Sequence, residues 1–210
     1  MNPARIVVVG GGAAGFFTAL ACAEARRDSE ILILEKTSHF LSKVKISGGG
    51  RCNVTHACFD PRELTTRYPR GERALIAPFQ QFQAADTVAW FERRGVKLKT
   101  EADGRMFPVT DSSQTIVDCL VNAANDAGIK LKSNNGVETV IKKSGDEFEL
   151  KLSTGETLVC DKLLLATGGC RTPTLGQLAV SLGHKLEPPV PSLFTFHIET
   201  PALRGLAGVS

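Results

Sequence analysis

The first 35 residues contain the feature that most constrains the fold: a strand, a glycine-rich turn, a helix and a second strand in immediate succession. Residues 6–9 form an apolar, β-branched run, which is typical of a strand buried on both faces of a parallel sheet. The following turn has the spacing Gly10-x-Gly12-x-x-Gly15, and a second apolar run at residues 31–34 ends in Glu35. This order predicts one βαβ unit that binds a dinucleotide.

Each glycine of the turn has a separate physical role in this prediction. Gly10 permits a tight turn after the strand, and Gly12 lets the backbone approach a diphosphate with no Cβ in the way. Gly15 allows the helix to pack closely on the sheet. The helix, with Ala13 and Ala14 in its first turn, then presents free N–H groups and a positive dipole end to the phosphates.

Glu35 stands at the carboxyl end of the second predicted strand, and Lys36 follows it. A carboxylate at this place can accept hydrogen bonds from both hydroxyl groups of an adenosine ribose, and it would repel a 2′-phosphate. The site therefore favours FAD or NAD over NADP.

A membrane span is the competing interpretation of the uncharged residues 6–23. The glycines at positions 10, 11, 12 and 15 would make a poor spanning helix, and a second strand follows at once. We therefore reject a membrane segment and an export signal, and we expect a cytoplasmic protein.

Composition limits the class of protein further. The chain has 210 residues, 42% of them hydrophobic and 22% charged, which is ordinary for a globular protein. A net charge of +3 is too small to argue for nucleic acid as a partner. The six cysteines include no pair separated by two residues, so no zinc or redox CxxC centre and no metal site is predicted.

A second glycine-rich stretch lies at residues 45–53, Lys-Ile-Ser-Gly-Gly-Gly-Arg-Cys-Asn. Three consecutive glycines mark a sharp turn or a backbone that lies against something flat. We expect this loop to continue along the cofactor, with N–H groups near Gly49 and Gly50 meeting phosphates or a flavin ring and Arg51 supplying positive charge. A merely flexible loop is the alternative.

These two glycine stretches resemble the BaiN-like bacterial flavoproteins, which are FAD-dependent oxidoreductases of the glutathione-reductase-like type. The segments at 104–108, 166–169 and 182–185, and the one at 191–193, are also similar to family motifs. The resemblance covers essentially the whole chain. It implies FAD as cofactor, hydride or electron transfer to a small molecule, and NAD(P)H as a possible electron donor.

The residue pattern and the resemblance together predict a set of cofactor contacts. They are Gly10, Gly12, Ala13, Ala14, Gly15, Glu35, Lys36, Gly49, Gly50, Arg51, Cys52, Asn53, Val137, Ala166, Thr167, Gly168 and Gly169. No catalytic acid or base emerges, since the flavin itself carries the chemistry. For Cys52 two roles are open: a thiolate beside the flavin, or a small residue that fits against the cofactor, which we favour because no clear resolving cysteine is nearby.

The rest of the chain is expected to complete an α/β domain. The predicted elements are helical segments within 60–94, a strand at 96–99, an edge strand or extended loop at 105–109, a helix from about 111 to 128, a strand at 129–132, a β-meander at about 136–160, a buried strand at 161–166 and a helix at 175–182.

We therefore predict a Rossmann-type parallel sheet over residues 1–187 with an inserted antiparallel meander, and the start of an incomplete inserted domain at 188–210. The C-terminal part that closes such folds is expected to be absent from this chain. Two alternative functions stay open: a non-catalytic FAD-binding fragment or module, and an NAD-dependent Rossmann dehydrogenase.

Overall fold

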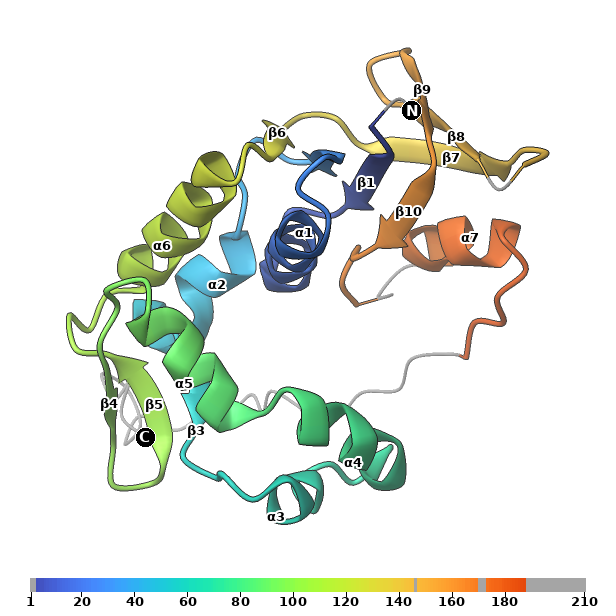
Figure 1. Cartoon of the computed structure of the whole chain (residues 1–210). Coiled ribbons are helices and arrows are strands. Elements are labelled where there is room, and N and C mark those ends of the chain that lie inside the picture. The colour runs from blue at the N-terminus through green and yellow to red at the C-terminus, as the bar shows by residue number, and fades with distance from the viewer. Residues whose placement is uncertain (1–2, 146, 170–172, 188–210) are drawn as a thin grey trace, which may run out of the picture.

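A four-stranded parallel sheet forms the centre of the computed structural model, which describes residues 3–145, 147–169 and 173–187. Its strands lie in the order β10-β1-β2-β6 (Figure 1). Their bounds are Arg5–Val9 for β1, Glu30–Leu34 for β2, Lys130–Lys132 for β6 and Lys162–Leu165 for β10. The two strands predicted from the glycine fingerprint are thus the inner strands of the sheet.

The two inner strands are buried on both faces, as their continuous apolar sequence predicts. Alternate residues such as Val8 and Ile33 point toward α1 (Ala13–Ala25) and α6 (Ser113–Asp126), which lie side by side on one face (Figure 1). Their neighbours, such as Val7 and Leu32, face a second core on the other side of the sheet. Period-2 alternation between two apolar cores explains why no polar residue interrupts either strand.

The second core is closed by the antiparallel meander that the sequence predicts. It consists of β7 (Val137–Lys142), β8 (Phe148–Leu152) and β9 (Thr157–Cys160). The buried side chains of Leu150 and Leu152 pack toward the central sheet, and helix α7 (Pro173–Ser181) lies against β7. The chain then enters β10 directly from the meander.

A long excursion connects β2 to β6 and carries most of the remaining elements. In chain order they are α2 (Ser42–Ile46), a 3₁₀ turn (Ser47–Gly50), β3 (Thr55–His56), α3 (Pro61–Thr65), α4 (Glu72–Gln81), α5 (Ala84–Glu92), β4 (Leu98–Thr100) and β5 (Arg105–Pro108). In Figure 1 α3 and α4 lie at the end of the molecule far from the meander.

Two local expectations need correction. The segment 105–109 was expected at a sheet edge because Pro108 cannot donate a backbone hydrogen bond. Instead β5 is the middle strand of the small sheet β3-β5-β4, since β3 pairs only with residues 105 and 106 and leaves Pro108 with one neighbour, Leu98. The glycine-rich stretch at 45–53 was expected to be a loop, but its first two residues belong to the short helix α2 (Ser42–Ile46).

Some expectations fall on residues that the structure does not describe. They are the domain start at 188–210, the motif at 191–193 and the cysteine at position 170. Within the described ranges, no helix combines the length and the hydropathy needed to cross a membrane.

Candidate cofactor site

The first glycine turn contains two glycines that are packed against backbone atoms, Gly10 and Gly15, and one that is open, Gly12. Gly10 has a φ of +112°, and a Cβ there would stand 2.3 Å from the carbonyl oxygen of Ala166. A Cβ on Gly15 would stand 2.0 Å from the carbonyl oxygen of Gly10. Both positions therefore exclude any side chain, in agreement with the roles given to them from the sequence.

Gly12 has the opposite environment. No atom lies within 4 Å of the position that a Cβ on Gly12 would occupy. Gly12 is the N-cap of α1 and offers no side-chain cap, so the N–H groups of Ala13 and Ala14 at the start of the helix have no partner in its own hydrogen-bond pattern. This open helix start fits the diphosphate of a dinucleotide.

Glu35 is held directly beside this turn. Its Oε2 accepts a hydrogen bond of 2.8 Å from the N–H of Gly11, and its Oε1 accepts bonds of 2.9 Å from the N–H and the hydroxyl of Thr37. These donors fix the orientation of the carboxylate at the end of β2. Oε1 already accepts two hydrogen bonds, whereas Oε2 accepts one and keeps capacity for a further donor, such as a ribose hydroxyl.

The segment before the meander approaches the same end of β2. The N–H of Asn135 donates to the carbonyl of Glu35 at 2.8 Å, and Cγ of Lys36 lies 3.1 Å from where a Cβ on Gly136 would stand. Val137 begins β7 immediately afterwards. The structure thus brings three of the predicted contacts, Glu35, Lys36 and Val137, to one end of the site.

The turn after β10 completes the other side of the fingerprint. The N–H of Ala166 donates to the carbonyl of Val9 at 2.8 Å, so this turn lies directly against Gly10. Thr167 and Gly169 belong to the same turn, and Gly168 has a φ of +81°. A Cβ on Gly168 would stand 3.2 Å from Nζ of Lys43, which reaches the turn from α2.

The second glycine turn repeats the division between packed and open positions. A Cβ on Gly48 would stand 2.7 Å from the backbone nitrogen of Asn53 and 2.8 Å from the ring of Phe107. Gly49 and Gly50 have no atom within 4 Å of the same position. All three glycines have positive φ, which explains why the chain turns so sharply here.

The side chain of Arg51 is held by protein groups outside the second glycine turn. Its Nη1 lies 2.5 Å from Oε1 of Glu101 and 3.5 Å from Oδ1 of Asp111, and its guanidinium stands 4.0 Å from the centre of the Phe107 ring. The hydrogen bond to Glu101 is the main reason that the pKa of Arg51 is raised. The charge that the sequence assigned to cofactor phosphates is therefore largely offset by protein carboxylates.

Cys52 is buried, with 6% of its surface exposed. Burial raises the pKa of its thiol, and a hydrogen bond with Ser47 only partly opposes that shift. The geometry favours a neutral thiol that fits the turn over a thiolate.

An apolar cavity of about 260 Å³ lies between the two glycine turns. It is lined by Ala13, Phe17, Lys43, Val44, Ser47, Cys52, Asn53, Val54, Thr87, Phe91, Ile116 and Leu120. Lys43 is a charged residue in this lining and was not among the predicted cofactor contacts. Its position depends on helix α2, which was not predicted. Its only sequence signal was its place just before the second glycine stretch.

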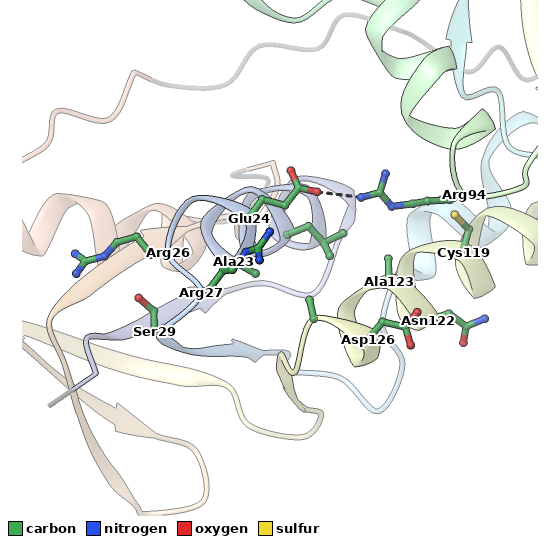
Figure 2. Close-up of a pocket in the computed structure, with 12 residues that line it drawn as sticks. Ala23, Glu24, Arg26, Arg27, Ser29, Arg94, Cys119, Asn122, Ala123 and Asp126 are labelled. Atoms are coloured by element: carbon green, nitrogen blue, oxygen red, sulfur yellow. Dashed lines mark hydrogen bonds and ion pairs between the residues drawn. The ribbon is translucent and has the colours of Figure 1, made fainter.

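A larger hollow, of about 650 Å³, lies elsewhere (Figure 2). It is formed where α1 and α6 end, and Glu24 pairs with Arg94 across it at 3.0 Å. The C-terminal ends of helices carry partial negative charge, which disfavours phosphates, although Arg26, Arg27 and Arg94 also line this hollow. Size alone therefore does not identify the cofactor site, whose helix start and open glycines lie at the opposite end of α1.

The comparison with protein families agrees with this geometry. Residues 4–190 match the family described as the HI0933-like protein Rossmann domain. The chain belongs to this family. Members of the HI0933-like family are flavoproteins of the type that the glycine motifs predicted, so the family resemblance and FAD as cofactor are both confirmed.

The relatives of this HI0933-like chain are named for different activities. A 3-dehydro-bile acid delta(4,6)-reductase of Clostridium scindens is 29% identical over 98% of this chain and 50% of its own length. A ribosomal RNA dihydrouridine synthase of Escherichia coli is 30% identical over 97% of this chain and 51% of its own length. The chain thus spans about half the length of these relatives.

A solved structure supports the fold independently. The 3-ketosteroid-delta4-(5alpha)-dehydrogenase of Rhodococcus jostii RHA1 aligns with a TM-score of 0.58 at 18% identity, over 80% of this chain and 46% of that one. At this identity the likeness concerns the fold alone. Among the described residues, no group of three or more His, Cys, Asp or Glu side chains could hold a metal ion.

Proposed function

We propose that this chain is the FAD-binding part of a reductase that transfers hydride to a carbon–carbon double bond conjugated to a carbonyl. One observation carries the cofactor part of this proposal: Gly12, Gly49 and Gly50 are open where their neighbours are packed. Gly12 has a φ of −90°, so neither packing nor backbone conformation requires glycine there, and a ligand that approaches the backbone closely explains it. Gly49 and Gly50 also need glycine for their positive φ.

The chain's own residues would hold the dinucleotide along its length. The first N–H groups of α1, at Ala13 and Ala14, are oriented to donate to the diphosphate. The carboxylate of Glu35 would accept hydrogen bonds from the adenosine ribose, with Lys36 and Val137 beside it. The turn at 166–169 and the open glycines 49 and 50 would line the path toward the flavin. Bound FAD would supply the hydride-transfer chemistry.

The printed activities of the relatives support the reaction class. One is named as a reductase of a bile acid's double bonds, and the other as a synthase of dihydrouridine, the product of adding two hydrogens to uridine. Both substrates present a double bond that a neighbouring carbonyl makes electron-poor, so a hydride donor of the same kind suits both. The substrate of this chain would share that feature, as a small molecule or a nucleoside.

NAD(P)H is the electron donor that we propose. The sequence contains no second GxGxxG segment, so the nicotinamide would approach bound flavin without a Rossmann site of its own in this chain.

The first experiment is the visible absorption spectrum of the purified chain, followed by release and identification of its nucleotide. We expect the bands of oxidised flavin, release of FAD, and anaerobic bleaching by NADH or NADPH that an added enone reverses. Release of NAD in place of FAD would contradict the proposal and restore the dehydrogenase alternative.

A second candidate function is a FAD-binding module that performs no turnover alone. It is favoured by the fact that the chain spans about half the length of its relatives. Bound FAD that neither NADH nor NADPH bleaches would support this candidate.

A further inference from the structure

Binding of FAD brings two negative phosphate charges to the start of α1, and the protein has to offset them. Arg51 was the cation expected to do so, but its guanidinium is held by Glu101, Asp111 and Phe107. Another positive charge is therefore needed at this edge of the sheet.

Lys43 is in the right place to supply that charge. It projects from α2, its Nζ adjoins Gly168 in the turn after β10, and it lines the cavity that Ala13 and Ser47 also line. The cavity lining contains no acidic residue. Over the part of the chain that the structure describes, the ammonium group of Lys43 has no ion pair or hydrogen bond, although the backbone carbonyl of this residue accepts one from the N–H of Ser47.

The local electrostatics of the free protein are unfavourable in this arrangement. An ammonium group and the positive end of the α1 dipole face the same cavity, with no carboxylate between them. An anion bound between the two would remove this repulsion and gain a charge-assisted hydrogen bond.

We propose that the ammonium group of Lys43 pairs with an anionic group of FAD, namely its diphosphate, and so takes the role that the sequence assigned to Arg51. This inference rests on the proposed FAD site and adds a residue to it. The reduced flavin ring is the other anionic group within the same cofactor, and the experiment below distinguishes the two.

The test compares Lys43→Gln with Lys45→Gln. Lys45 lies on the same helix and, like Lys43, is exposed, so its substitution changes the net charge equally, but it is not part of the cavity lining. FAD is titrated into the apoprotein by flavin fluorescence at low and high salt. We expect Lys43→Gln to weaken FAD binding about tenfold and to flatten its salt dependence, and Lys45→Gln to match the wild type.

The midpoint potential of the bound flavin provides the second readout. If Lys43 pairs with the reduced ring, Lys43→Gln will lower the potential and leave the affinity for oxidised FAD unchanged. Equal affinity, salt dependence and potential in the two variants would overturn the inference while leaving FAD binding intact. A folded wild-type chain that binds no FAD would contradict both this inference and the proposed function.

Discussion

The two glycine turns of this protein each contain three consecutive glycines, and in each turn some glycines are packed against protein atoms while others are open. In the first turn, Gly10 and Gly15 are closed by backbone atoms, and Gly12 is open. In the second, Gly48 is closed by Asn53 and Phe107, and the next two glycines are open. Closed glycines serve the packing of the fold, and we propose that the open ones of these two turns face the cofactor.

The turns differ in how a charged side chain holds them. Glu35 binds the N–H of Gly11 and keeps its carboxylate at the site, beside the open position. The guanidinium of Arg51 instead pairs with Glu101, which lies between strands β4 and β5 of the small sheet. A charged residue next to a glycine motif can thus either face a bound ligand or form contacts within the protein. Its interaction partners show which of the two applies.

The largest expected effect is on a closed glycine. Gly15→Val would place side-chain atoms against the carbonyl oxygen of Gly10, a rigid backbone group 2.0 Å from the new Cβ. We expect a loss of unfolding free energy of about 3 kcal/mol, as for severe overpacking. Urea denaturation measures it, and Gly12→Ala is the matched control, with a cost of about 1 kcal/mol at most. Equal stability of the two variants would remove the distinction between closed and open glycines.

The open glycine should show the reverse behaviour. A Cβ at position 12 meets no protein atom within 4 Å, so we expect Gly12→Val to fold, but its side chain would occupy the path of the diphosphate. We expect FAD affinity to fall at least about 100-fold, which corresponds to roughly 2.7 kcal/mol. Flavin fluorescence titration measures the affinity. Normal flavin content in a folded Gly12→Val protein would refute the binding mode.

The two charged residues sharpen the comparison at smaller magnitude. Glu35→Ala should weaken FAD binding about tenfold by removing the ribose acceptor. Arg51→Ala should lower the unfolding free energy only slightly, since the pair with Glu101 is partly exposed to solvent, and should leave the FAD affinity unchanged. Flavin fluorescence titration of both variants measures their FAD affinity, and urea denaturation measures their unfolding free energy. A marked loss of FAD affinity in Arg51→Ala would return this side chain to the cofactor site.

The smallest effect concerns the pH dependence of Cys52. Because burial raises its pKa, the folded chain should keep the neutral thiol to higher pH than the unfolded chain does. The contribution of the Cys52 thiol to the unfolding free energy is therefore complete below the pKa that the thiol has in the unfolded chain. This contribution is lost as the pH rises through the higher pKa of the thiol in the folded chain. Alkylation followed by mass spectrometry should find Cys52 slower in the folded than in the denatured chain at pH 8. Equal alkylation rates in the folded and the denatured chain would favour a thiolate at Cys52 over the neutral thiol.

The sequence predicted the central layers of the fold well, because their signal is local and strong. The apolar runs ending at Val9 and Leu34, the helix starting at Ala13 and the meander all lie where periodicity placed them. The middle position of β5 was not predictable in the same way, since it depends on the two-residue strand β3, which leaves almost no pattern.

The site was predicted as a set of segments, but not as a set of side-chain partners. Whether Arg51 faces a phosphate or Glu101 depends on a residue 50 positions away in the chain. Lys43 escaped notice because α2 has five residues, too few for a helical period to be recognised. The identities of the individual cofactor contacts stay predictions.

The neighbours of β1 have a consequence for how the protein is made. On one side, Arg5 binds Glu30, only 25 positions along the chain, so this pairing can form early in synthesis. On the other side, the N–H of Arg5 binds Asp161, which is 156 positions away and directly precedes β10. At about 5–20 residues per second, one edge of the apolar β1 strand waits on the order of ten seconds for its partner on the ribosome. During this interval the nascent chain has an unpaired hydrophobic strand edge, the kind of surface that chaperones protect from aggregation.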